Sequence, residues 1–208
     1  MSTYPPASPD EDRFFLSLPR GSVRAILALQ IVGLFWLLLL LPPEHRIPIP
    51  LNLYFLLSLV LIFFVSHGRT IAGANSDGPS PLFLPAGSIR VLIVLGTAGV
   101  LAYLHFSRGE NLAERLTPDP AQLRHWPGFL GAMLGGFAVG YLLRCLPLVR
   151  SRALKVINSW VSVVAMLLLV VEAIIQLTIL PTLKQEYDLY IWESVLTAVV
   201  AFYFGSRS

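Results

Sequence analysis

The chain has 208 residues, of which 55% are hydrophobic and 13% are charged, and its formal net charge is +3. Soluble domains carry about 25% charged residues, so this composition, with a mean hydropathy of +0.71, excludes an ordinary soluble domain and predicts an integral membrane protein. The fifteen basic residues form no run interleaved with aromatics, which argues against nucleic-acid binding, and the single cysteine, Cys145, excludes an intramolecular disulfide and a cysteine-based metal cluster.

The first twelve residues form a short polar tail. It contains three prolines and three consecutive acids, at Pro5, Pro6, Pro9, Asp10, Glu11 and Asp12. A segment this short and polar cannot bury a core, and its acidic charge differs from the positive start of a signal peptide. We therefore predict a disordered cytoplasmic tail over residues 1–12, followed by a single transmembrane domain over residues 13–208.

Two near-identical decapeptides each open a long apolar run. Residues 16–25 (LSLPRGSVRA) and 82–91 (LFLPAGSIRV) share the pattern L-P-x-G-S-[VI]-R and lie 66 residues apart. A proline followed by Gly-Ser is typical of a helix start, with Ser22 and Ser88 as N-caps. Because a cation in the first turn opposes the helix dipole, we expect Arg24 and Arg90 to contact anionic lipid headgroups.

The residues expected to direct insertion and contact headgroups all lie at the predicted cytoplasmic surface. They are Gly21, Ser22, Arg24, Gly87, Ser88, Arg90, Arg152 and Arg207. One interpretation is a device that only starts each helix at the right depth. The alternative is a specific binding seam for anionic lipid or for a partner protein.

Apolar runs of about 20 residues are long enough to cross a bilayer as helices. The chain contains six such runs, at residues 23–41, 51–66, 89–106, 128–148, 154–180 and 189–205. The second run is short and the fifth is long, which membrane thinning and helix tilt accommodate. We predict an all-α integral membrane fold with six transmembrane helices.

The basic residues predict the orientation of these helices. Ten of them lie on the side of the amino terminus and five on the opposite side, and an excess of positive charge marks the cytoplasmic side. Both termini are therefore expected in the cytoplasm, with the helices paired in three hairpin modules at residues 13–69, 81–144 and 150–207. We predict a multi-pass protein of a bacterial inner (plasma) membrane.

A weaker third copy of the repeat opens the fifth run. Residues 150–154 (RSRAL) align with residues 22–26 (SVRAI), and each module ends in an aromatic, small and basic sequence. This similarity indicates either a threefold internal repeat or convergence on the same interfacial chemistry, and the sequence leaves both open.

The fourth run carries small residues at helical spacing. Its members are Gly128, Gly131, Ala132, Gly135, Gly136 and Gly140. Small residues let helices approach closely in lipid, where van der Waals contact replaces the hydrophobic effect as the driving force. We predict a packing face that is either central in the fold or at a subunit interface; a pore lining or a hinge is the alternative.

Two carboxylates lie at membrane depth in the last module. Glu172 is nine residues before Pro181, about 13 Å along a helix, and Glu193 is a few residues into the sixth run. Gln176 lies one turn from Glu172 on the same face. Since a carboxylate in hydrocarbon costs several kcal/mol unless it is protonated or paired, these groups should face protein or water.

Two interpretations of this cluster remain open. In the first, Glu172 and Glu193 bind a proton or a cation, and Gln176 orients them. In the second, they form an ion pair or a hydrogen-bond network with His105, Arg108 or Arg124, which the topology places on the same side.

The sequence contains no recognisable catalytic or cofactor motif. There is no H-E-x-x-H, P-loop or G-x-S-x-G pattern, and all four histidines fall at span ends or in connections, where they cannot hold a haem. We therefore expect a non-enzymatic membrane protein without cofactor or metal, acting as a packing, scaffold or accessory subunit of a homo- or hetero-oligomeric assembly. The alternative is a small channel or a proton- or cation-coupled transporter that uses Glu172 and Glu193.

Overall fold

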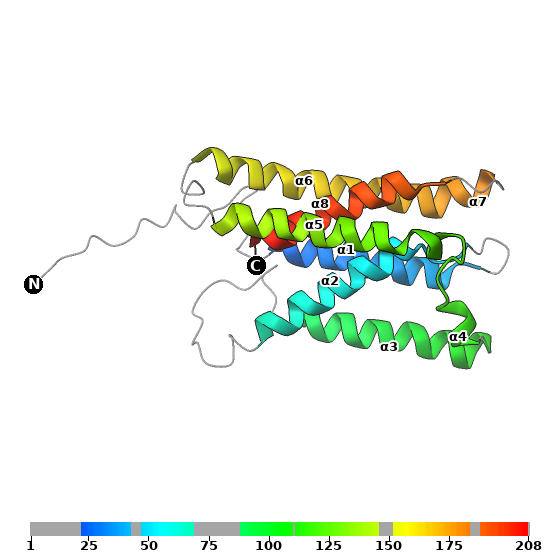
Figure 1. Ribbon diagram of the computed structural model, residues 1–208. Helices are drawn as coiled ribbons and strands as arrows, with labels where there is room; N and C mark the ends of the chain where they lie inside the picture. Colours follow the sequence, from blue (N-terminus) through cyan, green and yellow to red (C-terminus); the bar gives the residue numbers. More distant parts are fainter. Residues whose placement is uncertain are drawn as a thin grey trace, which may run out of the picture.

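A computed structural model shows the chain as a bundle of long helices (Figure 1). The structure describes residues 22–42, 47–68, 88–109, 111–145, 152–183 and 188–207. The predicted tail over residues 1–12 lies outside these ranges. The long helices are α1 (Ser22–Leu40), α2 (Leu51–Gly68), α3 (Ser88–Arg108), α5 (Trp126–Cys145), α6 (Arg152–Ile174) and α8 (Tyr190–Arg207).

Four shorter helical segments extend or connect the long helices. They are α4 (Leu112–Arg115), the 3-10 helix η5 (Gln122–His125), the π-helix η7 (Ile175–Ile179) and α7 (Leu180–Leu183). No helix was predicted between the apolar runs at residues 89–106 and 128–148, so α4 and η5 were not expected from the sequence. The π-helix interrupts the fifth predicted run, within which a continuous helix was expected.

The long helices run back and forth along one direction (Figure 1). We call the end where α2, α5 and α8 begin the distal end, and the opposite end, where α1, α3 and α6 begin, the proximal end. Long helices that follow one another in the chain run in opposite directions, so the chain returns to the proximal end after α2, α5 and α8. The contacts do not follow the predicted modules throughout, because α5 packs chiefly on α8 and α3 packs on α1. The three hairpin modules therefore stay a prediction.

Four helical segments are long and apolar enough to cross a membrane. They are Ser22–Leu40, Ser88–Arg108, Gln122–Cys145 and Ser159–Thr182, and Leu51–Phe63 and Tyr190–Ser206 are shorter apolar helices. Large side chains such as Leu95, Phe106 and Ile191 are exposed on the bundle surface. Such a surface suits lipid rather than water, so the chain is a membrane-embedded helical protein.

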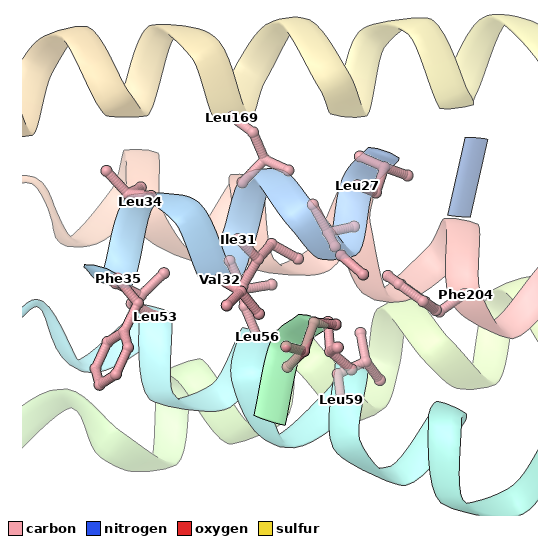
Figure 2. Packing of buried hydrophobic residues seen from close by; sticks show 14 of the residues in the cluster. Leu27, Ile31, Val32, Leu34, Phe35, Leu53, Leu56, Leu59, Leu169 and Phe204 are labelled. Carbon is pink, nitrogen blue, oxygen red and sulfur yellow. The ribbon is translucent and has the colours of Figure 1, made fainter. Parts of the chain in front are cut away.

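The core is built around α1. Leu27, Ile31 and Leu38 of this helix are wholly buried. Figure 2 shows α1 side chains packing between α2, where Leu56 and its neighbours point toward them, and α6, which contributes Leu169. Burial on several sides of α1 explains why its sequence is apolar all round rather than amphipathic.

Two arginines, Arg108 and Arg115, donate hydrogen bonds to the carbonyls at the carboxyl end of α1, and we call this pair the arginine cap. The last carbonyls of a helix have no intrahelical donor. Arg108 donates to Leu40 O and Leu41 O, each at 3.2 Å. Arg115 donates to Leu38 O at 2.6 Å and also bonds the next carbonyl, that of residue 39, at 3.3 Å. Positive charge at this end also complements the helix dipole.

Further hydrogen bonds join the connections at the distal end. Asp119 N donates to Ile49 O at 3.2 Å, and the Tyr54 hydroxyl donates to Leu116 O at 2.6 Å. These bonds connect the start of α2 to the segment between α3 and α5. The polar segment therefore packs over the bundle end.

Candidate functional site

Glu172 and Glu193 come together near the distal end of the bundle. Glu172 lies on the last turns of α6 and Glu193 on the first turn of α8. Their exposed fractions are 1% and 0%. The structure therefore places both predicted carboxylates inside the protein, away from the lipid-facing surface.

Gln176 connects the two carboxylates. Its side-chain Nε2 donates to Glu172 Oε1 at 3.0 Å and lies 3.5 Å from Glu193 Oε1. Gln176 belongs to the π-helix η7 and is itself buried. Single-turn π-helices occur frequently at functional sites, and this one carries the amide that contacts both acids.

A proline two residues after the π-helix removes a backbone donor. Leu180 N donates to Ile175 O across the widened turn. The next residue, Pro181, has no N–H, so the carbonyl of Gln176 has no donor in that register. The main chain beside the site is therefore less constrained than in a regular helix.

Three further side chains complete the site. Trp192 Nε1 donates to Glu172 Oε2 at 2.6 Å, and Asn52 of α2 is another hydrogen-bonding neighbour of Glu172. Gln122 of η5 donates from Nε2 to Glu193 Oε1 at 3.1 Å. These partners come from three separate elements, so the site forms only when the last hairpin, α2 and the distal connection pack together.

Among the described residues, two acceptor oxygens in the site receive no hydrogen bond. They are Glu193 Oε2 and Asn52 Oδ1, on side chains that are 0% and 1% exposed. Glu172, by contrast, receives a bond on each of its oxygens. Because buried polar atoms are almost always paired, Glu193 Oε2 is the position in the site where a further donor or a cation fits.

The ion pairs considered from sequence do not form. Within the part of the chain that the structure describes, neither Glu172 nor Glu193 has a basic partner. Arg108 is instead directed at the end of α1, and the exposed ring of His105 stacks edge-on with Phe106 at 5.0 Å between centroids. The second interpretation is therefore wrong about which residues bond the two carboxylates. Their hydrogen-bond donors are amides and an indole, not basic side chains.

The small face of α5 packs against α8 of the same chain. A Cβ atom added at Gly136 would overlap Ala198 O, and one added at Gly140 would overlap Phe202 O. The contact is reciprocal, because a Cβ at Gly205 of α8 would overlap Phe137 O of α5. At Gly128 the added atom would overlap the Tyr190 hydroxyl. These glycines serve an intramolecular helix contact.

The remaining small residues of α5 lie differently. A Cβ at Gly131 or Gly135 would have no atom within 4 Å, and Ala132 is half-buried. Gly135 borders an apolar groove of about 550 Å³ between α5, α6 and α8, with Trp160 and Phe202 among its lining residues. The predicted packing face thus divides into a part used within the chain and a part left open.

The repeated motif lies at the starts of α1 and α3. The described parts of these helices begin at Ser22 and Ser88, and the predicted N-cap role of the two serines stays a prediction. The Arg24 guanidinium lies 4.9 Å from the ring centroid of Phe63 on α2, and Arg90 is half-buried. Gly21 and Gly87, and the side chains of Arg152 and Arg207, lie outside the described residues.

Sequence reasoning missed Asn52, Gln122 and Trp192. A single amide at the start of an apolar run, as at Asn52, is a detectable signal because it is costly in lipid without a partner. Trp192 precedes Glu193 directly, but an interfacial tryptophan is common at a helix end. For Gln122, in a polar connection, the sequence contains no distinguishing signal.

Comparison of the chain with protein-family models, with curated proteins and with solved structures gave no match.

Proposed function

We propose that this protein binds a proton or a small monovalent cation at Glu172 and Glu193, as the binding site of a cation-coupled transporter or of a channel. The observation that carries the proposal is the unpaired Oε2 of Glu193, on a side chain that is 0% exposed. A bound proton or cation supplies the missing positive partner.

The unequal surroundings of the two acids assign their roles. Glu172 is held by Gln176 on one oxygen and by Trp192 on the other, so hydrogen bonds already stabilise its charge. Glu193 has donors on Oε1 only. In this proposal Glu193 takes the proton or cation and Glu172 provides the permanent negative charge beside it.

The donor set favours a small singly charged occupant. Among the described residues there is no group of three or more His, Cys, Asp or Glu side chains that would hold a metal ion. Carboxylate and amide oxygens suit a proton or a hard cation, whereas soft transition metals prefer imidazole and thiolate ligands. We propose a singly charged occupant because, within the described part of the chain, Glu193 Oε2 is the one carboxylate oxygen of the four without a donor.

The membrane placement is part of the proposal. In it, α2 and α8 also cross the bilayer, which gives six spans, and the three hairpins are related by an internal repeat. The ten basic residues on the side of the termini against five on the other favour a cytoplasmic proximal end. The membrane is then the inner membrane of a bacterium, with anionic headgroups next to the arginines of the repeated motif.

Infrared difference spectroscopy on proteoliposomes tests the binding directly. Acidification, or exchange of choline for sodium, should change a carboxyl or carboxylate band in the wild type. Glu193→Gln should abolish that change, while Glu114→Gln, at an exposed position of α4, should keep it. A wild-type spectrum identical to that of the Glu172→Gln, Glu193→Gln double variant would end the proposal.

A second candidate function, accessory subunit of a membrane assembly, has support from the open part of the α5 face. Gly131 and Gly135 have free space over their Cα atoms, and small faces of this kind receive partner helices in lipid. Native gels of Gly131→Leu and Gly135→Leu should then show loss of an oligomer band. Wild type and variants that migrate identically, at the size of one chain, would contradict it.

A further inference from the structure

The Gln122 side chain lies on the distal side of the carboxylate site. Its Nε2 donates to Glu193 Oε1 at 3.1 Å, and its own Oε1 accepts from Leu51 N at 2.6 Å. Gln122 is half-buried, and its neighbours Ala121 and Leu123 are exposed. Among the described residues, the Gln122 amide therefore connects the wholly buried Glu193 carboxylate to an exposed segment of the distal end.

The proximal side of the site is closed by apolar packing. On α6, Leu169 and Ala165 precede Glu172 in the sequence and lie on the same face of the helix. They are 2% and 0% exposed. On α8, Leu196 and Val200 follow Glu193 and are both wholly buried. Figure 2 shows Leu169 directed into the core beside α1. Bare ions and protons do not cross such a layer without polar groups to receive them.

Two hydroxyls on the proximal side of the site are bonded to main-chain carbonyls. The Thr197 hydroxyl donates to Glu193 O at 2.7 Å, and the Ser162 hydroxyl donates to Ser159 O at 2.6 Å. Every residue between Ser162 and Glu172 along α6 is apolar. This stretch of α6 therefore offers no polar side chain between the carboxylates and the proximal end.

From this asymmetry we infer that the cation or proton reaches Glu193 from the distal end only, with the Gln122 side chain as the gate, and that the site holds its occupant in an occluded state rather than in an open pore. This inference rests on the proposed function and narrows it to a carrier-like mechanism. Gln122 is a positioning residue here, because it acts on access to Glu193.

The two hydrogen bonds of Gln122 explain how the gate opens and closes. Its bond to Glu193 Oε1 can persist when the occupant lies on Oε2, because Oε1 keeps its lone pairs. For the occupant to enter, the Gln122 side chain must rotate, so that its carbonyl oxygen leaves Leu51 N. Its return restores both bonds and occludes the bound occupant.

The backbone of η5 allows this rotation without unfolding the connection. Gln122 N donates to Asp119 O at 3.1 Å, and Ala121 N donates to Asp119 Oδ1 at 2.9 Å. Asp119 is in turn bonded to Ile49 O. The main chain is thus held at Asp119, and the movement requires only the torsions of the Gln122 side chain.

Access is measured with an introduced thiol. In Glu193→Cys proteoliposomes, a cationic, membrane-impermeant methanethiosulfonate is applied to one side of the vesicle. The native Cys145, exposed at the end of α5, reports which molecules present their proximal end to the reagent. Position 193 should be modified only in molecules whose Cys145 is protected, as read by peptide mass spectrometry.

Opening the gate should accelerate this modification. In this background Gln122→Ala removes the bond from Leu51 N and the bulk of the amide, so the distal rate should rise at least about tenfold. The matched control is Thr117→Ala, at an exposed position of the same connection whose hydroxyl bonds Ala113 O; its rate should equal that of the parent. Modification from the proximal side, or an unchanged rate in Gln122→Ala, would overturn the inference.

A second measurement leaves both carboxylates intact. After a pH step on the distal side, the infrared carboxyl band should respond faster in Gln122→Ala than in the wild type, and a step on the proximal side should give no fast response. An equal response from both sides would overturn the gate while leaving cation binding intact. A missing band would instead remove the proposed function.

Discussion

The indole Nε1 of Trp192 donates a hydrogen bond of 2.6 Å to Glu172 Oε2, across the contact between α8 and α6. The two residues are 20 positions apart and belong to the two arms of the last hairpin. This bond gives Glu172 a donor on its second oxygen. Because the bond can form only when α6 and α8 pack together, its loss would show that the carboxylate site is not assembled.

Replacing Trp192 with Phe should destabilise the protein. The ring remains, but the N–H is lost, and an unpaired buried acceptor costs about 1 to 3 kcal/mol. Thermal unfolding in detergent, followed by circular dichroism, should show a lower midpoint. Trp126→Phe, at an exposed position at the start of α5, serves as the control; equal midpoints for the two variants would contradict the bond.

Adding one methyl group should separate the two classes of glycine on α5. In Gly136→Ala the new Cβ meets the Ala198 carbonyl, and overpacking of this kind costs about 1 to 3 kcal/mol. In Gly131→Ala the new atom meets open space, and alanine is the better helix former. Thermal unfolding should therefore rank Gly136→Ala below the wild type and Gly131→Ala at or above it.

The same two variants show whether the small face of α5 packs within the chain or against a second chain. Since Gly136 packs within the chain, its substitution should lower stability at every protein concentration. A loss of stability that disappears at high concentration would instead show that a second chain covers Gly136.

Removing the arginine cap of α1 should weaken the distal end. Arg115→Met keeps an unbranched side chain but leaves the carbonyls of Leu38 and Leu39 without the guanidinium, at a cost of about 1 to 3 kcal/mol. Hydrogen exchange should increase in the last turn of α1. Arg124→Met, at an exposed position of η5, should leave that exchange unchanged; the same increase in both would rule out a specific cap.

The contact between α1 and α3 depends on one hydrogen bond in the apolar region. Trp36 Nε1 donates to Thr97 Oγ1 at 3.0 Å. Thr97→Val should destabilise the bundle by about 0.6 kcal/mol, the average for such bonds between membrane helices, and by at most about 1.7 kcal/mol. Thr97→Ser keeps the hydroxyl and should stay close to the wild type in unfolding midpoint; a midpoint as low as that of the valine variant would disprove the role of the bond.

Much of the helical framework was predictable from sequence, since apolar length alone sets helix positions in a membrane protein. The repeated motif predicts helix starts near Ser22 and Ser88, and these are the first described residues of α1 and α3. The π-helix at residues 175–179 was not predictable, because an apolar run has no pattern that distinguishes one extra residue in a turn.

The candidate site was predictable only in part. The carboxylates of Glu172 and Glu193 stand out because their side chains are rare at membrane depth. Their partners depend on tertiary packing: Gln122 is 71 residues from Glu193 and comes from a different hairpin. The assumption that opposite charges would pair failed because Arg108 binds the carbonyls at the end of α1 instead.

The arginine cap of α1 has a consequence for the order of assembly. Helix α1 is synthesised first, but the groups that satisfy its last carbonyls follow 67 to 77 residues later, on Arg108 and Arg115. Until the second hairpin arrives, those carbonyls must be met by water or headgroups at the bilayer surface. Helix α1 therefore reaches its final depth only after Arg108 and Arg115 have been synthesised. In a ribosome-stalled chain that ends before Arg108, the carboxyl end of α1 should be accessible to proteases.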